Sequence, residues 1–353
     1  MGSGRAINNR NFIDFLIMKK KTFGHVSPAR WLMLGFMLIV IFALCDLKCG
    51  AMNYSWHDLI AAIQHPGATD ETTINIMQVR LPMVLMAMMA GSGLAIAGLL
   101  LQRVTQNPLA CPSLSGIEYG AALSVIISHM LMPQIVRPAA ISVAVLGGLL
   151  TYFLMQAIVK KIGASTLGIT LIGVAFNSLY YSVIQAVLLA FPYHAQAILY
   201  DLNGSLHGVT MHDIQFICLP FIALMMAAFL LAKRLDLLDL DEFQANTLGV
   251  AIHQYRLFLL GLSILLATLL TSIIGPLLFF GLVIPHLVKP LTHKSYHLMF
   301  FCAVFGAAFL LIAEFMTRIV SPQTPPPVGI IMLLMAAPLL LFITRRYVAY
   351  DQS

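Results

Sequence analysis

The sequence has little charge for its length. Only 10% of its 353 residues are Asp, Glu, Lys or Arg, whereas soluble globular domains carry about 25%. The 60% share of hydrophobic residues leaves too little polar surface for a water-soluble fold. The 20 basic residues form no runs interleaved with aromatic or polar residues, so a nucleic-acid partner is not indicated. The composition therefore predicts an integral membrane protein.

Motifs for nucleotide and metal chemistry are also missing. The sequence contains no G-x-x-x-x-G-K-[S/T] loop, so any ATP-driven step must come from a partner. The glycine-rich run Gly91–Gly98 lies inside an apolar stretch with no preceding strand, which favours close helix packing over nucleotide binding. The 5 cysteines have no metal-site spacing, and the 11 histidines lie mostly at loops or span ends. We therefore predict no catalytic residue, no metal site and no cofactor bound by this chain.

Long apolar stretches, in contrast, are abundant. A helix needs about 20 mostly apolar residues to cross a bilayer. Ten stretches of roughly this kind occur, at residues 31–47, 82–102, 113–132, 138–159, 168–190, 214–232, 257–274, 277–288, 298–317 and 328–344. The eighth is short, which indicates a broken or re-entrant helix packed inside the bundle. The predicted fold is an all-α membrane protein with about ten transmembrane helices.

The distribution of basic residues predicts the orientation. With both termini in the cytoplasm, 16 of the 20 Lys and Arg residues fall inside and only Lys48, Arg80, Arg137 and Arg318 fall outside. We expect residues 1–30 to be a cytoplasmic amphipathic leader, 31–346 the transmembrane domain and 347–353 a cytoplasmic tail. The N-terminal segment has too short an apolar run for a signal peptide.

Charged residues within spans are costly and are usually paired or functional. Glu118 lies in the inner third of the third span, and Glu314 precedes Arg318 by four residues near the outer end of the ninth. The order of Glu314 and Arg318 favours a helical ion pair. A docking role for Arg318 is the alternative.

The most polar inside loop, residues 233–256, contains a short amphipathic segment. An acidic cap at Asp239 or Asp241 starts it, and Gly249 ends it. Its apolar face, which includes Phe243 and Leu248, predicts docking into a protein groove. The alternative, a helix on lipid headgroups, is disfavoured by its acidic residues.

Several segments carry a family resemblance in consistent order. They are Arg80-Leu81-Pro82; the small-residue run Gly91 to Gln102 followed by Asn107-Pro108-Leu109-Ala110-x-Pro112; Asn203-Gly204-Ser205-Leu206; Gly275-Pro276 with Phe280-Gly281-Leu282-Val283-Ile284-Pro285-His286; and Pro327-Val328-Gly329-Ile330 with Ala337-Pro338. From about residue 30 to 346 the chain resembles the iron-siderophore and cobalamin permease family of type II ATP-binding-cassette (ABC) importers.

The sequence departs from this family pattern on the outer side. Met83 stands where the family has a second arginine, and Pro325-Pro326-Pro327 replaces an acidic residue. The tryptophan that commonly precedes the G-S pair is replaced around Tyr200. The weaker outer charge favours a heterodimer with a homologous permease subunit.

The resemblance implies further partners: two cytoplasmic ATPases, which use ATP and Mg, and an external periplasmic or lipoprotein substrate-binding protein. By position it assigns binding-protein docking to Arg80 and Arg318, the cytoplasmic gate to Asn107, Leu109, Ser165 and Thr166, and ATPase coupling to Asp241, Glu242, Phe243, Ala245, Leu248 and Gly249. From the polarity of the fifth span, we expect Asn177, Tyr181 and Gln185 to line the translocation path.

The function implied by the resemblance is inward transport of an iron-siderophore complex across the bacterial inner membrane, with cobalamin or heme as alternative cargoes. A different class, the ion-coupled secondary transporter, would need a charged coupling residue at the midplane, and only Glu118 comes near that position. A membrane-embedded enzyme is disfavoured because no acid-base pair converges within the spans.

Overall fold

The structure is a computed structural model that describes residues 27–132, 134–163, 166–192, 195–239, 252–292 and 294–351. Within these residues every regular element is a helix, and turns or irregular segments connect the helices. The helices are α2 (Pro28–Lys48), α3 (Trp56–Gln64), α4 (Glu71–Ile74), the π-helix η1 (Asn75–Arg80), α5 (Leu81–Thr105), α6 (Ile117–Leu131), α7 (Arg137–Ile162), α8 (Thr166–Ala190), α9 (Ala195–Leu202), α10 (Met211–Leu231), η3 (Ala232–Asp239), α12 (Ile252–Ile274), α13 (Phe280–Val288), η4 (Lys289–Leu291), α14 (Ser295–Val320) and α15 (Val328–Asp351).

Each predicted span coincides with one of these helices. Among the described residues, seven helices are long and apolar enough to cross a membrane, and the apolar stretches of α6, α13 and α15 are shorter. The helical membrane fold predicted from the sequence is therefore confirmed, with about ten spans as an approximate count. The short eighth span is α13, which has 9 residues.

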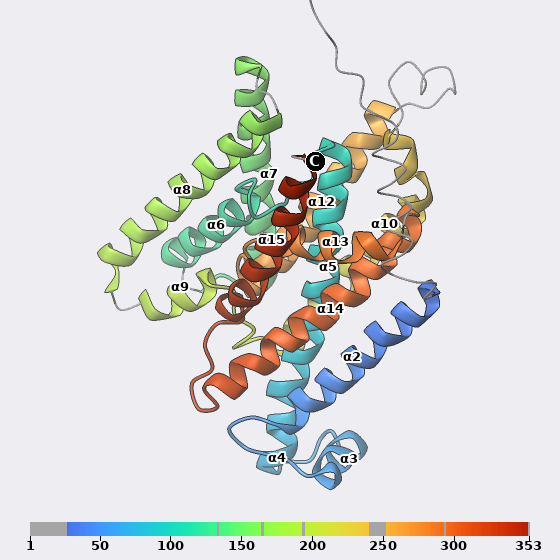
Figure 1. Cartoon of the computed structure of the whole chain (residues 1–353). Helices are drawn as coiled ribbons and strands as arrows, with labels where there is room; N and C mark the ends of the chain where they lie inside the picture. The colour runs from blue at the N-terminus through green and yellow to red at the C-terminus, as the bar shows by residue number, and fades with distance from the viewer. Residues whose placement is uncertain are drawn as a thin grey trace, which may run out of the picture.

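Helix α5 forms the centre of the bundle (Figure 1). It packs against α14, α12 and α13, and 78% of the span that contains it is buried. A helix that is apolar on all sides, as this one is, is typical of such a buried position. Helices α2 and α8 lie at the periphery, where only 17% of each span is buried.

Small residues allow α5 to approach its neighbours closely, as the Gly91–Gly98 run predicted. Gly91 lies against the backbone of Gly306 in α14, and Gly98 lies against the backbone of Gly281 in α13. A Cβ atom at either α5 position would overlap the facing backbone. The run is thus a packing surface, which is how small residues commonly serve in membrane helices.

The break between α12 and α13 is held by side chains from the α5–α6 region. The backbone N–H of Leu277 donates to the Glu118 carboxylate at 3.0 Å, and that of Phe279 donates to the Ser113 hydroxyl at 3.1 Å. Irregular backbone at membrane depth requires such internal partners, because lipid offers none. Glu118, which the sequence indicated as a costly charge within a span and as the residue nearest to an ion-coupling position, therefore has a structural partner.

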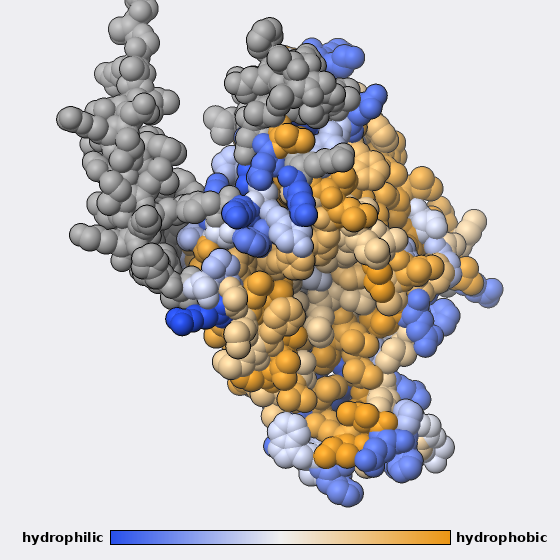
Figure 2. All heavy atoms as spheres, turned by 90° about the vertical axis from the view of Figure 1, so that its right-hand side faces the viewer, coloured by the Kyte–Doolittle hydropathy of each residue, from blue (hydrophilic) through white to orange (hydrophobic). Residues whose placement is uncertain are grey.

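The surface around α2 is broadly hydrophobic. Figure 2, which views the molecule from the right-hand side of Figure 1, shows this apolar face and, at its lower end, hydrophilic residues around a smaller apolar patch. Exposed residues of α2 include Met37, Val40 and Ile41. Their exposure is expected for a helix that faces lipid acyl chains.

Candidate functional site

Arg80 lies at a distortion of the long helix that leads into α5. The segment Asn75–Arg80 is a π-helix, and Pro82 follows it in the first turn of α5. Proline has no N–H and its ring clashes with the carbonyl four residues earlier, so the wider π turn accommodates it. The Arg-Leu-Pro sequence thereby places the Arg80 side chain toward the outer end of α2.

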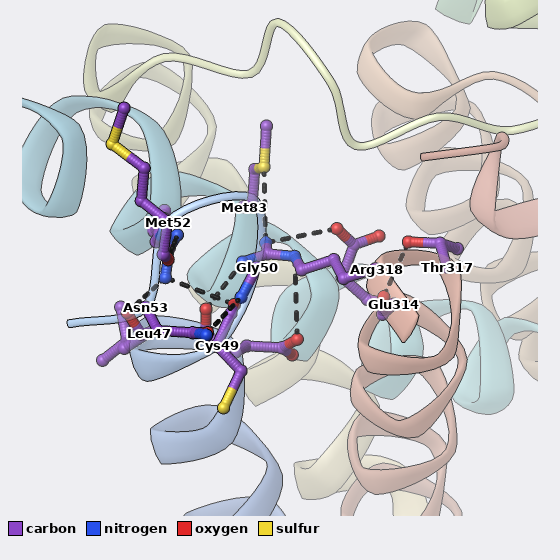
Figure 3. Close-up of polar contacts among 11 residues, drawn as sticks. Leu47, Cys49, Gly50, Met52, Asn53, Met83, Glu314, Thr317 and Arg318 are labelled. Atoms are coloured by element: carbon purple, nitrogen blue, oxygen red, sulfur yellow. Dashed lines mark hydrogen bonds and ion pairs between the residues drawn. The ribbon is translucent and has the colours of Figure 1, made fainter. Parts of the chain in front are cut away.

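The Arg80 guanidinium binds the backbone where α2 ends (Figure 3). Nη1 donates to the carbonyls of Leu47 at 2.8 Å and Cys49 at 3.2 Å, and Nη2 donates to Met52 at 2.5 Å. The guanidinium also lies over the Tyr54 ring, 4.4 Å from its centroid. Helix ends leave carbonyls without intrahelical donors, and Arg80 supplies donors for them.

Arg318 completes the same cluster from α14. Its Nη1 donates to the carbonyl of Asp46 at 2.6 Å, and its Nη2 lies 3.3 Å from Glu314 Oε1. Nε lies 3.9 Å from Asp46 Oδ1. The ion pair between Glu314 and Arg318 that their spacing predicted is therefore confirmed. We call Asp46, Arg80, Glu314 and Arg318 the outer charge cluster, after the side on which the predicted orientation places these residues.

The two guanidinium groups of the outer charge cluster are almost fully buried. Arg80 is 6% exposed and Arg318 is 7% exposed, so both guanidinium groups face this chain's own backbone and carboxylates. Met83, which departs from the family pattern, places its sulfur 3.6 Å from Arg318 Nη2. The docking role assigned to the two arginines stays a prediction, and their contacts favour a structural role at the ends of α2, α5 and α14.

At the opposite end of α5, Asn107 organises the N-P-L-A-x-P loop. Its Oδ1 accepts from the backbone N–H of Leu109 at 2.9 Å, which forms an Asx turn. Its Nδ2 donates to the Thr170 hydroxyl of α8 at 3.1 Å. Thr170 received no role from the sequence; its only signal is its position near the start of the fifth span, beside Thr166.

A cavity of about 300 Å³ lies at this end of α5, which is the inner end in the predicted orientation. Its walls include Asn107 and Leu109 from the loop, Tyr152 from α7, Thr170 from α8 and Arg256 from α12. Leu109 is 44% exposed, whereas Asn107 is buried. The structure thus brings two of the predicted gate residues together with the first turns of α8 at one cavity.

Some of the predicted site residues cannot be placed. Ser165 lies outside the described residues, and Thr166 is described only as the first residue of α8. The predicted coupling residues also lie outside the described residues; they are Asp241, Glu242, Phe243, Ala245, Leu248 and Gly249. Their roles stay predictions.

The three predicted path residues lie on α8. Asn177 is half-buried, and its Nδ2 donates to the carbonyl of Ser113 at 2.6 Å. Tyr181 is 48% exposed and packs edge-on against Tyr119 of α6, whereas Gln185 is half-buried. Exposed Ser178 and Ser182 extend this polar surface along the helix. The three residues therefore have different surroundings. Asn177 donates a hydrogen bond to the loop after α5, Tyr181 is largely exposed, and Gln185 is half-buried.

Comparison with known proteins gives consistent matches across the chain. The FecCD transport family matches residues 37–346. The Fe(3+) dicitrate transport system permease protein FecD of Escherichia coli is 30% identical over 306 residues, which cover 86% of this chain and 94% of that protein. The Fe(3+)-citrate import system permease protein YfmE of Bacillus subtilis is 29% identical and covers 93% of this chain and 98% of that protein.

A heme-related protein and a solved structure extend these matches. The probable heme-iron transport system permease protein IsdF of Staphylococcus aureus is 27% identical over 87% of this chain and 92% of that protein. A solved structure, described as an inward-facing metal-chelate type ABC transporter, superimposes with a TM-score of 0.77 at 26% identity. It covers 90% of this chain and 99% of that chain. By the extent of the family match and the identity to these relatives, the chain belongs to the FecCD transport family.

Proposed function

We propose that this protein carries an iron-siderophore complex inward across the bacterial inner membrane, as one permease subunit of an ABC importer. Its family consists of transport permeases, so the chain is a multi-span transport subunit and not an enzyme. The names of the relatives support iron as cargo, because two transport ferric citrate and one is named for heme iron. Cobalamin or heme are the alternative cargoes.

The proposal of a transport path rests on one observation, the exposed polar residues on the surface of α8. Only 17% of this span is buried, yet its exposed residues include Ser178, Tyr181 and Ser182. Polar residues in a span normally face a bundle interior or a water-filled cavity and not lipid. We infer that this stripe faces a second permease subunit across the path, with half-buried Gln185 continuing it.

The inner cavity supports a gate at the cytoplasmic end. Leu109 and Thr170 meet there, and the bond from Asn107 to Thr170 ties the loop after α5 to α8. We infer that a movement of α8 would be transmitted to this loop, which makes the pair a candidate gate together with Ser165 and Thr166. The orientation with both termini cytoplasmic follows from the positive-inside count.

Two cytoplasmic ATPases would supply the energy, with ATP and Mg bound by them and not by this chain. The segment Asp241–Gly249 is the candidate coupling helix, with Phe243 on its apolar face.

A periplasmic or lipoprotein substrate-binding protein would dock on the outer side, near Arg80 and Arg318. If the docking assignment is right, replacement of both arginines by alanine should reduce the salt slope of binding-protein association, because charges at an interface chiefly change the association rate and its salt dependence. A purely structural role of these two buried side chains predicts instead a loss of stability with the salt slope unchanged.

The proposal is tested by ATP-dependent uptake in proteoliposomes that contain the complete importer. We expect uptake of a ferric siderophore with the wild-type chain and none with Phe243→Asp, because burying an unpaired carboxylate in an apolar groove costs several kcal/mol. Gln244→Asp, on the neighbouring position, is the matched control and should retain uptake. Normal uptake by Phe243→Asp would contradict the coupling assignment, and uptake driven by an ion gradient without ATP would contradict the function.

A further inference from the structure

Helix α3 is apolar on two sides. Leu59 and Ala62 are buried against the rest of the chain. On another side, Trp56 is 51% exposed, Ile60 is 55% exposed and Ile63 is 67% exposed. These residues are separated by four and three positions, so they form one stripe along the helix. A stripe of this size on a short helix indicates a surface that something covers.

The exposed face of α2 leads directly to this stripe. Met37, Ile41 and Leu44 are exposed on α2, and Lys48 follows them at the same helical spacing. Helix α2 is a candidate membrane span of which only 17% is buried, and we infer that lipid covers this exposed apolar face. Lys48 therefore stands where the lipid-facing surface of α2 ends.

A direct contact joins the two surfaces. The ammonium of Lys48 lies over the indole of Trp56, 4.7 Å from the ring centroid. Figure 2 shows the broad apolar face and, at its lower end, a further apolar patch bordered by hydrophilic residues. Tryptophan and lysine are typical anchors at the level of lipid headgroups, where the ring meets acyl chains and the ammonium meets phosphates.

We propose that α3 is an interfacial helix that lies in the headgroup layer of the outer leaflet. The stripe formed by Trp56, Ile60 and Ile63 faces the acyl chains, and Lys48 binds lipid phosphate. The occupant is lipid and not a docked protein, because the stripe is continuous with the lipid-facing side of α2 through the contact between Lys48 and Trp56. The assignment to the outer leaflet rests on the orientation proposed above. The proposed contact with lipid is independent of that orientation.

The helix is formed independently of what covers the stripe. Ser55 caps it, since its hydroxyl accepts from the backbone N–H of Asp58 at 3.2 Å, and the Asp58 carboxylate accepts from the N–H of Ser55 at 2.8 Å. This reciprocal capping box begins the helix at Trp56. Substitutions on the exposed stripe therefore leave the helix start intact, which makes them suitable probes.

The experiment uses tryptophan fluorescence of the full chain in phosphatidylethanolamine and phosphatidylglycerol vesicles. The sequence has 2 tryptophans, so Trp31→Phe leaves Trp56 as the only one. We expect lipids brominated near the glycerol end of the acyl chain to quench Trp56 more strongly than lipids brominated near the chain end. Acrylamide in the aqueous phase should quench it weakly.

Two sets of variants distinguish insertion of the α3 stripe into lipid from a position merely near the membrane surface. In the Trp31→Phe background, Ile60→Asp with Ile63→Asp should reduce quenching by brominated lipid severalfold. His57→Asp with Gln64→Asp, which adds the same number of carboxylates at exposed polar positions of α3, should leave quenching unchanged. If the double variant fails to fold, quenching of the Trp31→Phe protein alone decides the proposal.

Two outcomes would overturn the proposal. One is Trp56 fluorescence that brominated lipids do not quench and that acrylamide quenches strongly. The other is protection of Trp56 from acrylamide only after the soluble substrate-binding protein is added, which would identify the stripe as a protein-docking surface. Neither outcome depends on whether the chain transports an iron chelate, so failure here leaves the transport proposal to its own test.

Discussion

Two carboxylates and two guanidinium groups are buried together in the outer charge cluster. Asp46 is fully buried, and both of its carboxylate oxygens lack a hydrogen-bond partner among the described residues. Arg318 is its nearest cation, at 3.9 Å from Oδ1. Removing one member of a buried ion pair is costly because the remaining charge loses its compensation. The cluster is therefore sensitive to single substitutions and tolerant of paired ones.

We expect Arg318→Met to lower the free energy of unfolding by about 3–5 kcal/mol, because it leaves Glu314 and Asp46 without their cation. Adding Glu314→Gln should restore part of the loss. Arg30→Met, at an exposed position on the inner end of α2, is the matched control. Chemical unfolding in detergent measures each value. Equal stability of Arg318→Met and wild type would show that the cluster contributes little.

Glu118 gives a second prediction at this scale. Glu118→Leu should cost about 1–3 kcal/mol, because the N–H of Leu277 loses its acceptor, whereas Glu118→Gln keeps a carbonyl in its place. Thermal unfolding measures the difference. The same pair tests the ion-coupled alternative, since Glu118→Gln cannot release a proton. Loss of uptake by a stable Glu118→Gln protein would support ion coupling and contradict the structural role.

At the scale of elements, the arrangement around α5 depends on backbone approach. Helices α13 and α14 reach α5 where glycines face each other, at Gly98 with Gly281 and at Gly91 with Gly306. Peripheral helices make single approaches of this kind, at Gly173 of α8 against the backbone of Leu114 and at Gly35 of α2 against the side chain of Val304. Helix α5 differs because it makes two such approaches to backbone, one to α13 and one to α14.

We predict that Gly98→Ala destabilises the protein by about 1–3 kcal/mol, since the new methyl group overlaps the backbone of Gly281. Gly261→Ala in α12 is the control, because a Cβ there meets nothing within 4 Å. Its better helix propensity should make it neutral or stabilising by up to about 1 kcal/mol. Thermal unfolding of the two purified variants compares them, and equal losses would contradict the close-packing explanation.

For the whole molecule, the exposed polar stripe of α8 indicates that one chain is incomplete. The proposed path along Tyr181 and Gln185 needs a facing wall, which a second permease subunit would provide. Met83 contacts Arg318. By the resemblance described above, an arginine is usual at this position, so we expect this chain to offer less outer charge than the family pattern. A homologous partner that keeps the arginine would restore a more positive docking face.

We therefore predict that the functional importer contains this chain beside a different, homologous permease. Native mass spectrometry of the complex purified with its ATPase counts the subunits. The expected result is one copy of this chain and one of the homologue with two ATPases. A transport-competent complex with two copies of this chain and no second permease would show that the heterodimer prediction is wrong.

The sequence by itself determined the class of fold and the family. Span positions follow from local apolar length, and each predicted span coincides with a helix because lipid requires every spanning segment to satisfy its own backbone. The short stretch at 277–288 likewise identified the broken helix. The pair Glu314 and Arg318 was predictable because its members lie one helical turn apart.

Only the tertiary structure decided how distant segments use their polar groups. Arg80 was predicted to meet a binding protein, yet its guanidinium binds carbonyls of the segment that ends α2. Likewise, Glu118 binds the N–H of Leu277 and Asn107 binds Thr170. These partners are separated by 28 to 159 residues in the sequence, so no local sequence pattern predicts the contacts between them. They depend on where helices meet, which close packing along the whole bundle determines.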